Sequence, residues 1–268
     1  MAIKIGVMLP VSTPDPARPV IGDVRASARF AEDAGLESVW STDHLVASAP
    51  ILDSAVVLAT AAAVTERITI GYGVLLLALR PAAWAAKQVS TLQIVSGNRI
   101  ALGIGTGNPA HGDIGWRAAG MSFADRGRRT DEYLRVLPAL VTGQPAALGD
   151  GLQVTLSPGA AMPPVLIAGN GDKALRRAAA YGDGWVSVAL RPEEVAAGLA
   201  TLGKLAGSQG RAVPRATVVA PVLDADQGKA ADQLAVYAEA GADRVILTPS
   251  GASWQQDYER AGRLLAAL

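Results

Sequence analysis

The chain has 268 residues, enough for one barrel-sized domain or two small ones, and 24 basic side chains balance 24 acidic ones. Zero net charge argues against nucleic acid or an anionic membrane as a partner, and the apolar runs are too short to span a bilayer. The absence of cysteine excludes disulfides and thiolate metal sites, and the first strand pattern leaves no room for a signal peptide, so we expect a cytoplasmic protein.

Short β-branched runs alternate with longer Ala-rich segments of helical period along the whole chain. The predicted strands are residues 3–9, 38–41, 68–76, 99–105, 165–168, 185–188, 217–222 and 244–247. The predicted helices are residues 22–35, 53–65, 82–95, 125–142, 172–181, 193–207, 227–240 and 253–267. This strict alternation predicts an α/β fold, a single-domain (β/α)8 TIM barrel over residues 1–268. A doubly wound open sheet is the alternative.

The longest stretch without helical or strand pattern lies between the fourth predicted helix and the fifth predicted strand. Residues 143–164 are rich in Gly, Pro and Ala, which is typical of a loop. We expect a long connection here between the two halves of the barrel, with a hairpin at residues 152–156.

The segment G-T-G-N-P-A, residues 105–110, matches the dinucleotide-binding pattern G-x-G-x-x-G/A. In a dinucleotide-binding fold this turn opens a helix at once, whereas Pro109, Gly112 and Gly115 interrupt one here. The glycines instead lie at the carboxyl end of the fourth predicted strand. Barrel active sites lie at this end, and glycine there allows close approach of a flat ligand.

Other polar residues also follow predicted strands. Asp43 and His44 follow the second strand, Asn108 the fourth, and the sequence I-A-G-N-G, residues 167–171, closes the fifth. The only two histidines, His44 and His111, both fall in such loops, where an imidazole can exchange protons near neutral pH. The alternative for each is a role in capping backbone groups, and for Asp43 a turn or helix cap.

Five longer stretches carry a family resemblance. They are F-A-E-D-A-G-L-E-S-V-W-S-T-D-H-L (30–45), T-E-R-I-T-I-G-Y-G-V-L-L-L-A-L-R (65–80), residues 85–108, residues 126–143 and residues 163–186. In this order they resemble the luciferase-like monooxygenase superfamily of flavin- and deazaflavin-dependent barrel enzymes. The resemblance implies a barrel that holds an isoalloxazine-type ring at its carboxyl-terminal mouth and transfers a hydride or activates oxygen there.

The resemblance also assigns roles to individual residues. His44, with Asp43 beside it, matches the position that members using coenzyme F420 place near the reactive ring carbon. Gly73 and Val74 match a non-proline cis peptide that supports the ring. The implied contacts to the cofactor come from two further loops: Gly105, Thr106, Gly107 and Asn108, and the phosphate-binding Ala168, Gly169, Asn170 and Gly171.

One position departs from part of the family. A sugar-phosphate dehydrogenase branch has an acidic glutamate where this chain has Asn108, which cannot exchange a proton, so that role is not transferred. Arg80 is a candidate for contacting a cofactor tail. The basic run 126–129 is expected to be a solvated, ion-paired helix face.

These observations predict an F420-dependent oxidoreductase that transfers a hydride between F420 and a small organic substrate, with His44 and Asp43 in catalysis. An FMN-dependent monooxygenase or flavin reductase, and a cofactor-binding protein without catalysis, are the alternatives. Aldolase and metal-dependent chemistry are disfavoured because no lysine points inward from the mouth end of a strand and two histidines cannot build a metal site.

Two further expectations concern partners. We expect the substrate pocket to be lined by Trp40, Leu75 and Ile114, which favours a small, apolar organic substrate. The Ala-rich segment 51–64 has a face that can pack against another subunit, and the family resemblance implies a homodimer.

Overall fold

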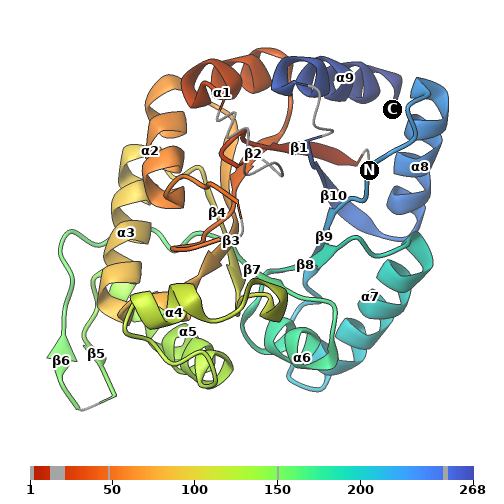
Figure 1. The fold of residues 1–268 in the computed structure, drawn as a ribbon. Helices are drawn as coiled ribbons and strands as arrows, with labels where there is room; N and C mark the ends of the chain where they lie inside the picture. Colours follow the sequence, from red (N-terminus) through yellow and green to blue (C-terminus); the bar gives the residue numbers. More distant parts are fainter. Residues whose placement is uncertain (1–2, 13–21, 48, 150, 250–252) are drawn as a thin grey trace.

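The computed structural model describes residues 3–12, 22–47, 49–149, 151–249 and 253–268. Eight parallel strands close into a barrel in the order β1-β10-β9-β8-β7-β4-β3-β2, surrounded by helices (Figure 1). These strands are β1 (Lys4–Met8), β2 (Ser38–Ser41), β3 (Thr69–Leu76), β4 (Ile100–Gly105), β7 (Val165–Ala168), β8 (Gly184–Val188), β9 (Arg215–Val219) and β10 (Ala242–Leu247). The predicted TIM barrel is confirmed, and the open sheet is excluded because β1 pairs with both β2 and β10.

The helices form the outer layer (Figure 1). They are α1 (Val24–Asp33), α2 (Ser54–Val64), α3 (Ala82–Val95), α4 (Ile114–Ala118), α5 (Arg126–Thr142), α6 (Asp172–Tyr181), α7 (Pro192–Gly207), α8 (Gln227–Glu239) and α9 (Trp254–Ala267), with short 3-10 turns η1 (Leu77–Leu79) and η2 (Pro109–His111). Side-chain caps start several of them: the Asp23 carboxylate accepts from two amides of α1 and Asp53 from one of α2.

Two layers of apolar side chains hold the barrel together. The barrel interior is filled by Trp40 and smaller residues from the other strands, among them Ala101, Leu166 and Val186. A Cβ at Gly71 would lie 2.1 Å from the Trp40 indole, so glycine in β3 makes room for this large side chain. The larger core lies between the strands and the helices, where α2 and α3 contribute buried Val, Leu and Ala.

Several boundaries differ from those predicted. β9 is Arg215–Val219 rather than 217–222, because Pro221 has no amide hydrogen for the ladder and Val222 is 73% exposed. The connection 143–164 contains a small antiparallel pair, β5 (Ala146–Ala147) with β6 (Gln153–Val154), close to the predicted hairpin. The region 109–118, predicted to lack helix, forms η2 and α4.

Candidate functional site

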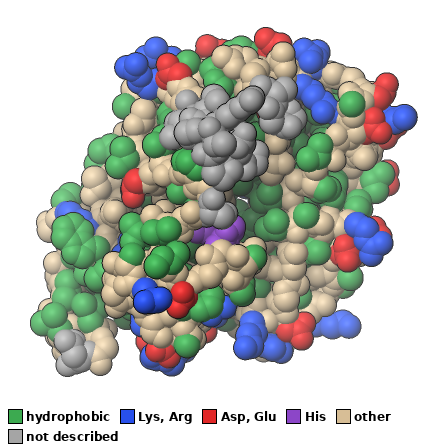
Figure 2. Space-filling view, in the orientation of Figure 1, with side chains coloured by type: hydrophobic (Ala, Val, Ile, Leu, Met, Phe, Trp, Pro, Cys, Tyr) green, Lys and Arg blue, Asp and Glu red, His purple; other side chains and the backbone are tan. Residues whose placement is uncertain are grey.

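The carboxyl ends of the barrel strands surround a cavity of about 510 Å³, within the usual size range of small-molecule sites. Every predicted site residue except Gly171 lines it, together with Thr42, Leu76, Pro109 and Val188, which the sequence analysis missed. Val188 is the last residue of β8, so its position at the end of a predicted strand was a usable signal. Figure 2 shows histidine side chains at the centre of this face, beside a hollow. We call this cavity the mouth cavity.

The floor of the mouth cavity is formed where β3 passes β4. The Gly73–Val74 peptide bond is cis, as predicted, and the register between the two strands shifts between Tyr72 and Leu75. A Cβ at Gly105 would lie 2.5 Å from Val74 Cγ2, so glycine in β4 allows Val74 to reach the cavity. The floor is therefore one apolar side chain set among glycine backbone, which suits a flat ring.

This geometry overturns the prediction that Trp40, Leu75 and Ile114 line the pocket. Trp40 is fully buried inside the barrel, where its indole N–H donates to the Ser38 hydroxyl at 2.8 Å. Leu75 is also buried, in the core between strands and helices, because the irregularity at Gly73–Val74 changes which side chains of β3 face inward. Ile114 lies on α4, half-exposed and outside the cavity lining.

Asp43 is a fully partnered carboxylate at the edge of the mouth cavity. It is 3% exposed and accepts hydrogen bonds from the Leu76 amide, the Ser54 hydroxyl and the Arg80 guanidinium, the last at 2.7 Å. The ion pair with Arg80 joins loops 37 residues apart. Arg80, predicted as a candidate contact to a cofactor tail, is instead engaged with Asp43, and this pair holds the residue directly before His44.

His44 follows directly and is half-buried in the cavity wall. Burial lowers the pKa of its imidazole below the ordinary value, the positive charge that His111 can carry lowers it further, and Asp43 opposes both effects. Burial therefore favours the neutral form of the imidazole, which can accept a proton from a group in the cavity. Neither histidine forms a hydrogen bond within the described ranges.

The loop after β7 provides the opposite wall. The Asn170 side chain donates to the Val188 carbonyl and accepts from the Val188 amide, and Trp185 Nε1 donates to the Gly169 carbonyl. These bonds fix the turn in which Gly169 has a φ of 133°, a conformation that favours glycine. Both polar atoms of the Asn170 side chain are thus bonded to Val188. Asn170 can therefore offer a ligand its backbone amide and the edge of its side chain.

The same loop leads into α6, whose N-cap is Gly171. The amides of Asn170, Gly171, Asp172 and Lys173 donate to no acceptor in the described parts of the chain. A Cβ at Gly171 would meet nothing within 4 Å, so the space above these amides is open. Free amides at a helix N-terminus favour an anion such as a phosphate, and the phosphate-binding role expected of Ala168–Gly171 stays a prediction.

The remaining motifs are structural. In the basic run 126–129, Arg128 pairs with Glu132 at 2.6 Å and the Arg126 guanidinium lies over the Phe123 ring at 3.8 Å, which confirms a paired helix face. The described residues contain no group of three potential metal ligands and no helix long and apolar enough to cross a membrane.

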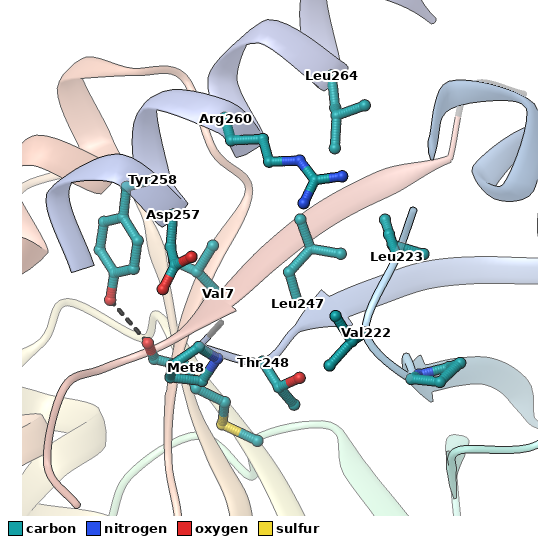
Figure 3. A pocket seen from close by; sticks show the side chains of 12 residues that line it. Val7, Met8, Val222, Leu223, Leu247, Thr248, Asp257, Tyr258, Arg260 and Leu264 are labelled. Carbon is teal, nitrogen blue, oxygen red and sulfur yellow. Dashed lines mark hydrogen bonds between the residues drawn. The ribbon is translucent and has the colours of Figure 1, made fainter. Parts of the chain in front are cut away.

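A second hollow lies at the rim, between β1, β10 and α9. Its walls are mostly apolar, and the Tyr258 hydroxyl donates to the Met8 carbonyl at 2.8 Å beside it (Figure 3). Its volume is only about 40 Å³, too small for an organic ligand. The mouth cavity, which nearly all of the predicted site residues line, is the candidate functional site.

Comparison with known proteins identifies the family of the chain. Residues 3–266 match the model of the family described as luciferase-like monooxygenase. An uncharacterized protein of Mycobacterium tuberculosis is 35% identical over 170 residues, which cover 62% of this chain and 58% of that protein. An F420-dependent hydroxymycolic acid dehydrogenase of the same species is 28% identical over 205 residues, covering 67% of this chain and 56% of the relative.

The chain thus matches less than two thirds of the length of these curated relatives. A solved structure of an F420-dependent secondary alcohol dehydrogenase with an F420-acetone adduct superimposes with a TM-score of 0.84 at 18% identity, covering 100% of this chain and 99% of the other. This similarity supports the fold. From the match over nearly its whole length, the chain belongs to the luciferase-like monooxygenase family of flavin- and F420-dependent oxidoreductases.

Proposed function

We propose that the protein is an F420-dependent oxidoreductase that transfers a hydride between coenzyme F420 and a small neutral substrate in the mouth cavity. The observation that carries the proposal is one cavity of about 510 Å³ that has a glycine-lined floor and the half-buried His44 imidazole in its wall, and that ends at Asn170, directly before the free amides of the α6 N-terminus. The F420-dependent relative at 28% identity favours this cofactor within the family.

The residues present fit such a cofactor. Val74 and the glycine backbone of β3 and β4 would support the ring, and the amides of Gly171 and Asp172 would hold its phosphate. When bound there, the deazaflavin supplies a ring carbon that accepts or donates a hydride. The protein supplies orientation, exclusion of water and a site for the proton.

His44 would take that proton. When an alcohol carbon loses a hydride, its hydroxyl oxygen must lose a proton as the carbonyl forms, and the neutral His44 imidazole in the cavity wall can accept it. Asp43, whose oxygens are already bonded to Arg80, Ser54 and Leu76, acts in this proposal by positioning His44. Asn108 would offer its side-chain amide to the ring or the substrate, since within the described residues only its oxygen is engaged, by the Ala110 amide.

The charge of the cavity favours a neutral substrate. Among the described residues that line it, Asp43 is the only carboxylate and its charge is matched by Arg80, while no lysine or arginine is present. An anionic substrate would find no free cation there. We infer small alcohols and ketones, or similarly neutral compounds, as the substrate class.

Turnover with both cofactors tests the proposal. The purified protein is incubated with F420 and a panel of secondary alcohols, and separately with reduced F420 and the matching ketones, while cofactor absorbance is followed. The same panel is run with FMN. Interconversion of the two F420 forms supports the proposal. Turnover only with FMN and oxygen would indicate a monooxygenase or flavin reductase, and binding without turnover would indicate a protein that has lost its chemistry.

We also propose that the protein is a homodimer joined through α2 and α3. These neighbouring helices (Figure 1) leave Val56 and Trp84 66% and 67% exposed, and α2 carries no charged residue. Sedimentation of the wild type as a dimer, and of Trp84→Asp as a folded monomer, would support this interface. A monomeric wild type at micromolar concentration would contradict it.

We further propose a cytoplasmic location, with which the absence of cysteine is consistent.

A further inference from the structure

The two histidines of the chain, far apart in sequence, lie against each other at the edge of the mouth cavity. Their ring centroids are 4.8 Å apart with the planes at 67°. His44 follows β2, whereas His111 ends η2 after β4. His44 lines the mouth cavity and His111 does not, so the second ring lies behind the first as seen from the cavity.

The local structure holds this pair in place. Gly115 of α4 packs against the backbone of Val46, where a Cβ would lie 3.2 Å from the Val46 amide nitrogen, and this contact joins the segment after β4 to the loop that carries His44. Trp116, 4% exposed, anchors α4 on the side chains of Leu76 and Leu79. The Asn108 side chain accepts from the Ala110 amide and so starts η2, at whose end His111 lies.

Between the two loops lies a small second cavity of about 10 Å³, bordered by both imidazoles and by Asn108. This volume is about that needed by one water molecule, and the site has polar groups to bind it. Proton transfer between the rings can therefore run directly after a small rotation or through one water. His111 is exposed, which gives the proton access to solvent.

On these observations we propose that His44 and His111 form a two-histidine proton relay, in which His111 exchanges the proton of His44 with bulk solvent. The inference rests on the proposed function and adds a residue to it. In alcohol oxidation, the carbon gives its hydride to the cofactor, the O–H electron pair becomes the carbonyl π bond, and the hydroxyl proton goes to a His44 nitrogen. That proton then passes to His111 and to water, and the reduction of a ketone runs the same steps in reverse.

The position of His44 explains why a relay is needed. Its cavity side is covered when substrate and cofactor occupy the mouth, so a proton accepted there must leave on the other side, where His111 lies. The charged groups near the pair are Asp43 beside His44, Arg80 bonded to Asp43, Asp113 after His111 and Arg117 on α4. Asp43 and Arg80 neutralise each other, and the nearby His111 lowers the pKa of His44, which favours release of a proton that His44 has accepted.

The test uses His111→Gln, which keeps a polar side chain but cannot carry a proton, with Arg117→Gln as the matched control on a neighbouring exposed position. The wild type and both variants are assayed with F420 and the secondary alcohol that the wild type oxidises fastest, in dilute buffer and with added imidazole. We expect His111→Gln to lower kcat about tenfold in dilute buffer, with F420 affinity unchanged, and imidazole to restore most of the loss. Arg117→Gln should match the wild type throughout.

The outcomes separate the relay from the proposed function. If the wild type turns over and His111→Gln equals it in dilute buffer, or is impaired without rescue by imidazole, the relay is wrong and the proposed function stands. If the wild type turns over no alcohol or ketone, the proposed function fails and the relay fails with it. A histidine NMR titration gives a readout independent of turnover: the His44 midpoint should rise in His111→Gln, and an unchanged midpoint contradicts the pair.

Discussion

The two ends of the barrel are both hollow but use their polar groups in opposite ways. The mouth cavity has a volume of about 510 Å³, and the hollow at the amino-terminal end of the strands has about 470 Å³. The amino-terminal hollow is lined by more charge, including Lys4, Arg99, Arg215 and Arg244. The two hollows are nearly equal in size, so volume does not separate them, and charge alone would favour the amino-terminal end.

The difference lies in the hydrogen bonds already formed. At the amino-terminal end Arg99 donates to the carbonyls of Ala62, Thr65, Ile68 and Ser96, and Arg244 forms a two-pronged ion pair with Glu37 at 2.6 and 2.5 Å. At the mouth and its edge, the two imidazoles and the first amides of α6 form no hydrogen bond with the described residues. Polar groups that still have free hydrogen-bonding capacity indicate a binding site, whereas polar groups that already have hydrogen-bond partners indicate a structural role.

The largest effect is expected at His44. His44→Gln removes the proton acceptor from the cavity wall, so kcat should fall by about 10²- to 10⁴-fold. Because no described residue depends on the imidazole for a hydrogen bond, the free energy of unfolding should change little. Steady-state kinetics with F420 and a chemical denaturation curve measure both. Unchanged turnover and unchanged F420 affinity would refute the role of His44.

A smaller effect, on stability and turnover together, is expected at Asp43. Asp43→Asn leaves the largely buried Arg80 without its counter-charge and should cost about 3 kcal/mol in the free energy of unfolding. The double variant Asp43→Asn with Arg80→Met should regain part of that loss, because no unpaired charge then remains. If the losses in unfolding free energy of the single variants Asp43→Asn and Arg80→Met simply add in the double variant, the ion pair does not stabilise this loop.

The amino-terminal end should respond in stability alone. Arg99→Met leaves four backbone carbonyls without their donor and should lower the free energy of unfolding by about 2 kcal/mol. The exposed Arg215, 4.0 Å from Asp243, provides the control Arg215→Gln, which should change little. Both folded variants should bind F420 as the wild type does. A loss of F420 affinity in folded Arg99→Met would place the site at this end.

The smallest effect is expected in how stability and turnover change with pH as His44 titrates. Its pKa is lowered on folding, so the stability linked to this group is fully present above the unfolded value near 6.5 and is lost as the pH falls through the folded pKa. Turnover in the alcohol-oxidising direction should fall over the same range, with an acid midpoint below 6.5. In Asp43→Asn the midpoint should move further down, since Asp43 raises the pKa of His44. A midpoint above 6.5 would contradict the burial of this imidazole.

The barrel and the location of the site at its mouth could largely be predicted from the sequence. The alternation of strands and helices predicts the barrel, and the glycines at positions 73, 105 and 169 lie at the mouth because each comes at or near the carboxyl end of a strand. The Gly73–Val74 cis bond was implied by the family resemblance and is confirmed. Predictions of this kind depend on local pattern and chain order.

What the sequence did not show depends on contacts between distant segments. The assignment of Leu75 to the pocket failed because the irregular register of β3 against β4 changes which side chains face inward. The pairing of Arg80 with Asp43 and the contact of His111 with His44 join loops that no periodic pattern connects. Trp116, which fixes α4 over this region, lies in a segment whose glycines predicted no helix.

The most direct test of the central claim is a fluorescence titration of F420 against three proteins: the wild type, Gly171→Ala and Gly171→Glu. Both substitutions fit, because a Cβ at Gly171 meets nothing within 4 Å and its φ of −95° is open to any residue. If the amides of α6 hold the cofactor phosphate, Gly171→Ala should bind within a few-fold of the wild type, and the charge of Gly171→Glu should weaken F420 by at least about tenfold. Equal affinity of all three folded proteins, or no binding to the wild type, would contradict a cofactor site at the mouth.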